Sequence, residues 1–89
     1  PSLVTTAWTN ASAGSGAAFF VNLDPVNPLA VDATIDLTRW GLPAGGYLAQ
    51  RVTLAGVAPL PPANAPTPYA LSTTIGPREI VMVEFTPSP

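Results

Sequence analysis

Strict period-two alternation over residues 29–37 constrains the fold of this chain more than any other feature of its sequence. Apolar side chains occupy the odd positions, and Asp32, Thr34 and Asp36 lie between them. Because successive side chains of a β-strand point to opposite faces, this pattern predicts a strand with one face toward a core. Glycine and proline interrupt the pattern over 38–46, and a second alternating run, 47–54, follows.

Four other stretches are typical of strands, because they are rich in β-branched or aromatic side chains and are separated by turn-forming segments. They comprise residues 3–9, 17–23, 69–75 and 79–85. We expect 3–9 and 17–23 to form a hairpin, and 29–37 to pair antiparallel with 17–23 across the short turn 24–28. The last strand is apolar on both sides, with Ile80 and Met82 opposite Val81 and Val83, so we expect it to be covered on both faces.

The segment 56–68 carries five of the chain's 12 prolines. Proline lacks a backbone N–H and favours the polyproline II conformation, so we expect a stiff, extended, proline-rich loop here. Residues 86–89 are predicted to be a tail or the start of a linker. The length of 89 residues predicts a single domain over 1–89.

Six short predicted strands, with turn signals between them and no helical periodicity, indicate an all-β chain. We expect a small antiparallel β-sandwich of about six to eight strands, Ig-like with Greek-key connections. A small β-barrel is the alternative. Only 9% of the residues are charged, so apolar packing and sheet hydrogen bonds must hold this fold together.

The composition argues against several classes of partner and chemistry. The net charge is −2 with three arginines and no lysine, so the clustered cations of a nucleic-acid-binding protein are missing. The longest apolar run, 17–21, is far too short to span a bilayer, so no membrane role is predicted. Cysteine is absent, which excludes disulfides and thiolate metal sites.

The side-chain inventory also argues against an enzyme. Histidine, lysine and cysteine, the common general bases and nucleophiles, are missing. Asp32 and Asp36 share a strand face, but four residues of strand separate them by roughly 13 Å, wider than the about 5 to 9.5 Å of a glycosidase pair. We therefore interpret them as solvent-facing residues and predict no catalytic residue and no cofactor.

Asn22, Asp24 and Asn27 could gather oxygen ligands for calcium around the turn 24–28. The same residue types are ordinary turn formers, and we favour that interpretation. No metal site is therefore predicted.

The candidate ligand-binding residues are aromatic side chains and a neighbouring cation: Trp40, Arg39, Trp8 and Tyr47. Exposed rings of this kind stack on sugar faces, and Arg39 beside Trp40 could orient a sugar or a peptide. Large aromatics also fill the cores of small domains, and we favour that interpretation for both tryptophans.

Four segments together resemble the C-terminal β-sandwich domains appended to many bacterial glycoside hydrolases. Residues 7–10 (AWTN) are similar to their opening strand, and 20–23 (FVNL) to a strand ending in V-N. Residues 31–45 (VDATIDLTRWGLPAG) are similar to their alternating strand ending in D-L-S-x-[YW]-G-L-P-x-G, and 76–85 (GPREIVMVEF) to their last strand. These motifs mark turns and strands, so the resemblance carries over no sugar-binding residue.

The resemblance implies a non-catalytic accessory domain of a secreted carbohydrate-active enzyme, partnered by a catalytic domain and with weak glycan contact at most. Such a domain should carry an apolar patch where the catalytic domain docks. One alternative is a stand-alone carbohydrate-binding module that holds a polysaccharide through aligned, exposed aromatics. Another is a self-assembling structural subunit of a filament, surface layer or phage decoration, whose sign would be an unpaired strand edge. Fold alone does not choose among them.

Overall fold

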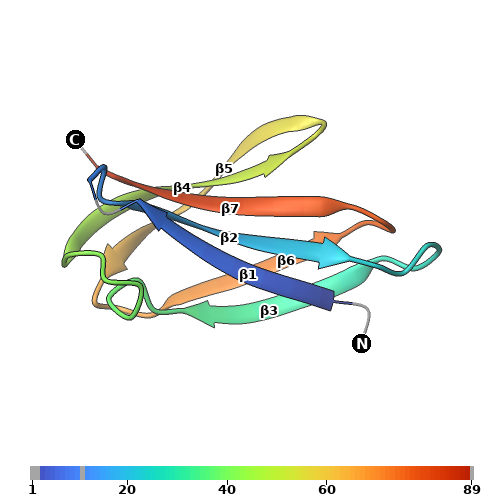
Figure 1. Ribbon diagram of the computed structural model, residues 1–89, viewed down its shortest axis with the longest axis horizontal. Helices are drawn as coiled ribbons and strands as arrows, with labels where there is room; N and C mark the ends of the chain where they lie inside the picture. The colour runs from blue at the N-terminus through green and yellow to red at the C-terminus, as the bar shows by residue number, and fades with distance from the viewer. Residues whose placement is uncertain (1–2, 11, 89) are drawn as a thin grey trace.

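The computed structural model describes residues 3–10 and 12–88, which form seven strands in two antiparallel sheets (Figure 1). The strands are β1 (Leu3–Asn10), β2 (Ser15–Asn22), β3 (Leu29–Ile35), β4 (Gly45–Thr53), β5 (Gly56–Ala65), β6 (Tyr69–Ile75) and β7 (Ile80–Pro87). These residues contain no helix, and therefore none long and apolar enough to cross a membrane. The prediction of a small antiparallel β-sandwich is confirmed, and the two sheets remain separate rather than closing into a barrel.

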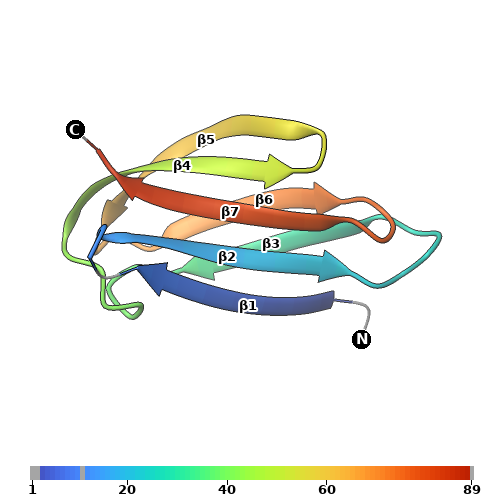
Figure 2. The same cartoon turned by 45° about the horizontal axis from the view of Figure 1, so that its top comes forward.

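The larger sheet has the strand order β1-β2-β7-β4-β5, and the smaller one pairs β3 with β6. Figure 2 shows the five strands in front of the two. The predicted β1–β2 hairpin is confirmed, and apart from the β4–β5 hairpin every other connection passes from one sheet to the other.

The predicted pairing of β3 with β2 is wrong, because β3 pairs with β6 and β7 takes the place beside β2. The turn 24–28 carries the chain across the core instead of back along the same sheet. In this arrangement Val31 and Ile35 of β3 and Phe20 of β2 all belong to the single buried core between the sheets. The alternation of β3 itself is confirmed, since Val31 and Ile35 are buried while Asp32 and Thr34 are exposed.

The predicted loop over 56–68 is also corrected, because most of this segment is strand β5, paired with β4. Two features let a proline-rich segment join a sheet. β5 is an edge strand, so its outer side needs no donors. In addition, the register between β4 and β5 shifts at the step from Tyr47 to Ala49, and Pro61 and Pro62 fall in this irregularity rather than in a regular pair.

The core lies between the two sheets, and Phe85 of β7 is at its centre with no exposed surface. Its ring meets those of Trp40 and Tyr69 edge-on, at centroid distances of 5.9 and 5.1 Å. Within the sheet Phe85 is flanked by Gly16 and Ala49, whose small size leaves room for these rings.

At the opposite end from Trp40, Arg51 of β4 ties the sheets together. Its Nε donates to Thr73 Oγ1 of β6 at 3.0 Å, and a second guanidinium nitrogen donates to the Thr74 carbonyl at 2.9 Å. The same nitrogen lies 3.5 Å from Glu79 Oε1, which also accepts from the Gly76 N–H.

Candidate functional site

The four predicted ligand-binding residues do not form one site. Trp8 lies on β1 and points away from the core, with 56% of its surface exposed. Tyr47 is buried, and its hydroxyl donates to the Pro43 carbonyl at 2.6 Å. Trp40 lies half-buried in the turn after β3 and packs on the core through Phe85. The two tryptophans therefore occupy opposite faces of the larger sheet.

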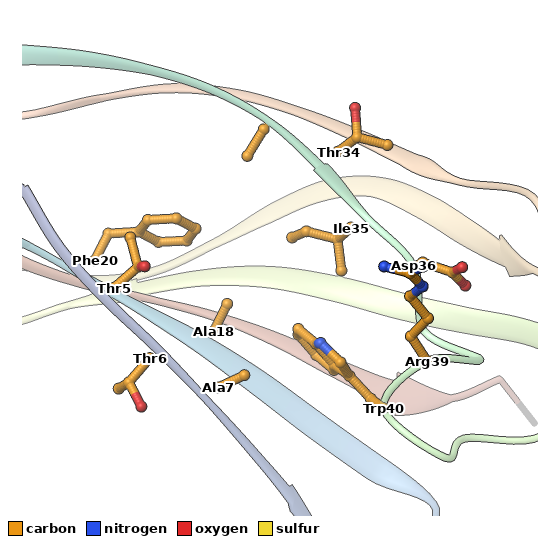
Figure 3. Close-up of a pocket in the computed structure, with 11 residues that line it drawn as sticks. Thr5, Thr6, Ala7, Ala18, Phe20, Thr34, Ile35, Asp36, Arg39 and Trp40 are labelled. Atoms are coloured by element: carbon orange, nitrogen blue, oxygen red, sulfur yellow. The ribbon is translucent and has the colours of Figure 1, made fainter.

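Trp40 and Arg39 line a groove of about 420 Å³ between β1 and β3, called here the Trp40 groove. Its lining, most of which is labelled in Figure 3, comprises Thr5, Thr6, Ala7, Ala18, Phe20, Ala33, Thr34, Ile35, Asp36, Arg39 and Trp40. Gly16 lets the indole lie against the sheet, since a Cβ at that position would come within 2.9 Å of the ring. Asp36 accepts hydrogen bonds from the Thr38 hydroxyl and N–H, which fixes the turn that carries Trp40.

The outward side of the larger sheet is a second candidate, whose residues come from five strands and are not adjacent in the sequence. We call it the outer face and define it by the side chains of alternating positions that point away from the core: Val4, Thr6, Trp8, Asn10, Ser15, Ala17, Phe19, Val21, Leu48, Gln50, Val52, Leu54, Val57, Pro59, Asn64, Ile80, Met82, Glu84 and Thr86. The polar ones among these are Thr6, Asn10, Ser15, Gln50, Asn64, Glu84 and Thr86, and the rest are apolar.

Two hollows lie side by side on the outer face and share Phe19 and Met82 as a common wall. The Leu54 hollow, of about 530 Å³, is otherwise lined by Val52, Leu54, Ala55, Arg78, Glu79 and Ile80. The Glu84 hollow, of about 480 Å³, is otherwise lined by Thr6, Ala7, Trp8, Ala17 and Glu84. The outer face is therefore both apolar and contoured.

The sequence predicted that β7 is covered on both faces, and the structure covers only one. Val81, Val83 and Phe85 have no exposed surface, whereas Ile80 is 57% exposed and Met82 is half-buried. Within the described residues nothing packs on the outer face of this strand, although β7 is the middle strand of its sheet.

The polar atoms of the turn 24–28, which could serve as calcium ligands, bind one another instead. Asp24 Oδ1 accepts from the backbone N–H groups of Val26 and Asn27 at 2.9 and 3.0 Å, and Oδ2 accepts from the Asn27 amide at 3.2 Å. Asn22 Oδ1 accepts from the Asp24 N–H at 2.9 Å. These contacts are those of a hydrogen-bonded turn, and the described residues hold no cluster of three or more His, Cys, Asp or Glu side chains.

Hydrogen bonds lower the pKa of two carboxyl groups below the ordinary value of 3.8. For Asp24 the cause is donation by the backbone N–H groups of Asn27 and Val26, and for Asp36 it is chiefly the Thr38 hydroxyl. A carboxyl whose pKa is lower in the folded state stabilises the fold above its unfolded pKa. This contribution is lost as the pH falls through the folded value.

We therefore expect the free energy of unfolding to fall as the pH is lowered from about 5 to 2, and the double variant Asp24→Asn/Asp36→Asn to show a flatter slope. Urea unfolding at a series of pH values measures both curves. The variant Asp32→Asn is the matched control, because Asp32 is exposed and accepts no hydrogen bond from any described residue. An equal flattening in Asp32→Asn would show that overall charge, rather than these turns, carries the effect.

Comparison with models of protein families, with curated proteins and with solved structures found no match for this chain.

Proposed function

We propose that this chain is a non-catalytic accessory β-sandwich domain of a carbohydrate-active enzyme, and that the outer face is the surface on which the catalytic domain packs. The observation that carries the proposal is the apolar outer face of the larger sheet, with Ile80 and Met82 of its middle strand uncovered by the rest of the described chain.

Covering the outer face is energetically favourable. Antiparallel sheets of isolated domains commonly alternate between an apolar and a polar side. Here the outward side is apolar over residues 17–21 of β2 and at Ile80 and Met82 of β7, as the inward side is. Contiguous apolar patches on domains mark interaction surfaces. Burial is worth about 25 cal/mol for each Å² of apolar surface, so side chains as exposed as Trp8, Leu54 and Val57 have much to gain from a partner.

The resemblance supplies the kind of partner. Domains with similar motifs accompany the catalytic domains of bacterial glycoside hydrolases, and these enzymes are secreted. Under this proposal hydrolysis belongs to the partner, and the chain examined by itself has no hydrolase activity.

The test is hydroxyl-radical footprinting of Trp8, Leu54 and Met82 in the full product of the gene, compared with the 89-residue chain alone. We expect several-fold slower oxidation of these side chains in the full product, because the catalytic domain covers them, together with glycosidase activity in the same particle. Val26, exposed on the turn 24–28, is the internal control and should react equally in both samples. Equal oxidation of the outer face in both samples, or a particle without glycosidase activity, would contradict the proposal.

A second candidate function, glycan contact, is favoured by the Trp40 groove, where a half-buried indole lies beside the exposed Arg39. In the same experiment, protection of Trp40 by a soluble polysaccharide, with Trp8 and Met82 unaffected, would support a binding module. Large assemblies of the isolated chain with a protected outer face would instead indicate the self-assembling subunit.

A further inference from the structure

Glu84 is the one charged side chain among those that define the outer face. It lies on the middle strand β7, in register with Ala17 of β2 on one side and Gln50 of β4 on the other. Its carboxylate forms no hydrogen bond or ion pair with any residue that the structure describes, and the one ion pair of those residues joins Arg51 to Glu79. A partner that covers the outer face would therefore also cover an unpaired charge.

The strand register creates a gap next to this carboxylate. Trp8, Ala17 and Glu84 stand side by side on β1, β2 and β7. Because neighbouring strands are about 4.8 Å apart, the backbones that carry Trp8 and Glu84 are separated by roughly 10 Å. The small Ala17 lies between the two larger side chains, and the result is the Glu84 hollow.

The chemistry of the hollow suits one kind of side chain. Glu84 attracts a cation, the indole of Trp8 offers a π-face that also binds cations, and Phe19 and Met82 form an apolar wall that suits a methylene stem. A guanidinium combines these features, because it is planar, stacks on aromatic rings and forms two parallel hydrogen bonds with a carboxylate. Burying Glu84 without such a partner would be strongly unfavourable.

We propose that the Glu84 hollow binds an arginine side chain of the domain that packs on the outer face. This inference rests on the proposed function. It implies that the outer face prefers a domain that carries an arginine opposite Glu84. A second copy of this chain is the competing occupant, because Arg78 lines the neighbouring Leu54 hollow, and the test below separates the two.

The test uses n-butylguanidinium as the probe, with the neutral n-butylurea as its isostere. Binding to the 89-residue chain is followed by NMR through the indole N–H signal of Trp8, which is assigned with a Trp40→Phe variant. We expect a saturable shift with a dissociation constant on the order of millimolar, and about fivefold weaker binding of n-butylurea. Glu84→Gln should weaken n-butylguanidinium binding by a similar factor.

The matched control is Asp32→Asn, which removes one exposed carboxylate from the other sheet and should leave binding unchanged. Equal binding of the two probes, or no effect of Glu84→Gln, would overturn the arginine assignment. If the mass of the chain doubles with concentration and n-butylguanidinium dissociates the dimer, the hollow binds a second copy. That result would also overturn the assignment to an arginine of another domain. These outcomes are independent of the footprinting result. If the outer face is protected in the full product but the hollow does not bind n-butylguanidinium, the arginine assignment is wrong and the proposed function is unaffected.

Discussion

Phe85→Ala is expected to lower the free energy of unfolding by about 3 to 5 kcal/mol. Phe85 has no exposed surface, and its ring holds both Trp40 and Tyr69 by edge-on contacts. Truncation removes the transfer energy of the ring and leaves a cavity that Gly16 and Ala49 are too small to fill. Because a domain of this size is stable by only about 4 to 13 kcal/mol, the loss is a large part of the total.

Urea unfolding followed by tryptophan fluorescence measures this effect, since Trp40 reports directly on the packing around Phe85. The matched control is Phe19→Ala, the same substitution on the neighbouring strand but on the outer face, where the ring is only half-buried. We expect Phe19→Ala to cost about 1 kcal/mol in the isolated chain, and Phe85→Leu, which keeps more of the volume, to remain folded. Equal losses for Phe85→Ala and Phe19→Ala would contradict the assignment of a single core between the sheets.

The sequence predicted those features of the fold that depend on local periodicity. Alternation identified the buried face of β3 and the strand character of β7 correctly, because both depend on local periodicity. It could not identify the partner of β3, because alternation specifies which face is buried and not which strand lies alongside. The proline content of β5 concealed a strand, because an edge position and a shifted register tolerate residues that a central strand would not.

The same holds for the candidate sites: neighbours in the sequence could be predicted, and contacts that depend on strand pairing could not. The sequence placed Trp40 beside Arg39 in one corner, and the structure brings both into the lining of the Trp40 groove. The row of Trp8, Ala17 and Glu84 could not be predicted, because it depends on the register of β2 against two other strands. The sequence did contain one indication of the outer face. Ile80 and Met82 are apolar, which indicates that the second face of β7 is covered but does not identify what covers it.

Asn22→Asp is expected to lower the free energy of unfolding at pH 7 by about 3 to 5 kcal/mol. Asn22 is fully buried at the end of β2, where its Nδ2 donates to the carbonyl oxygens of Asn27, Ile75 and Gly76 at 2.9, 3.1 and 3.2 Å. These bonds join β2, the turn 24–28 and the end of β6. The substitution keeps the shape of the side chain but turns the donor into a charged acceptor that faces three carbonyl oxygens, with no cation among its hydrogen-bonding partners.

The pH dependence of this variant separates its cause from a general loss of packing. Burial against carbonyl oxygens disfavours the charged carboxylate, so the pKa of the introduced acid should be higher in the folded state than its unfolded value of about 3.9. The loss in free energy of unfolding relative to the parent chain should therefore be smallest below about pH 4, where the protonated acid can still donate one hydrogen bond. Above that pH the loss should grow by about 1.4 kcal/mol per pH unit until the carboxyl ionises in the folded state. Asn64→Asp, at an exposed position of β5, makes the same chemical change and should cost little at any pH. A deficit in Asn22→Asp that is independent of pH would show that the side-chain amide is not the donor that holds this corner of the sandwich.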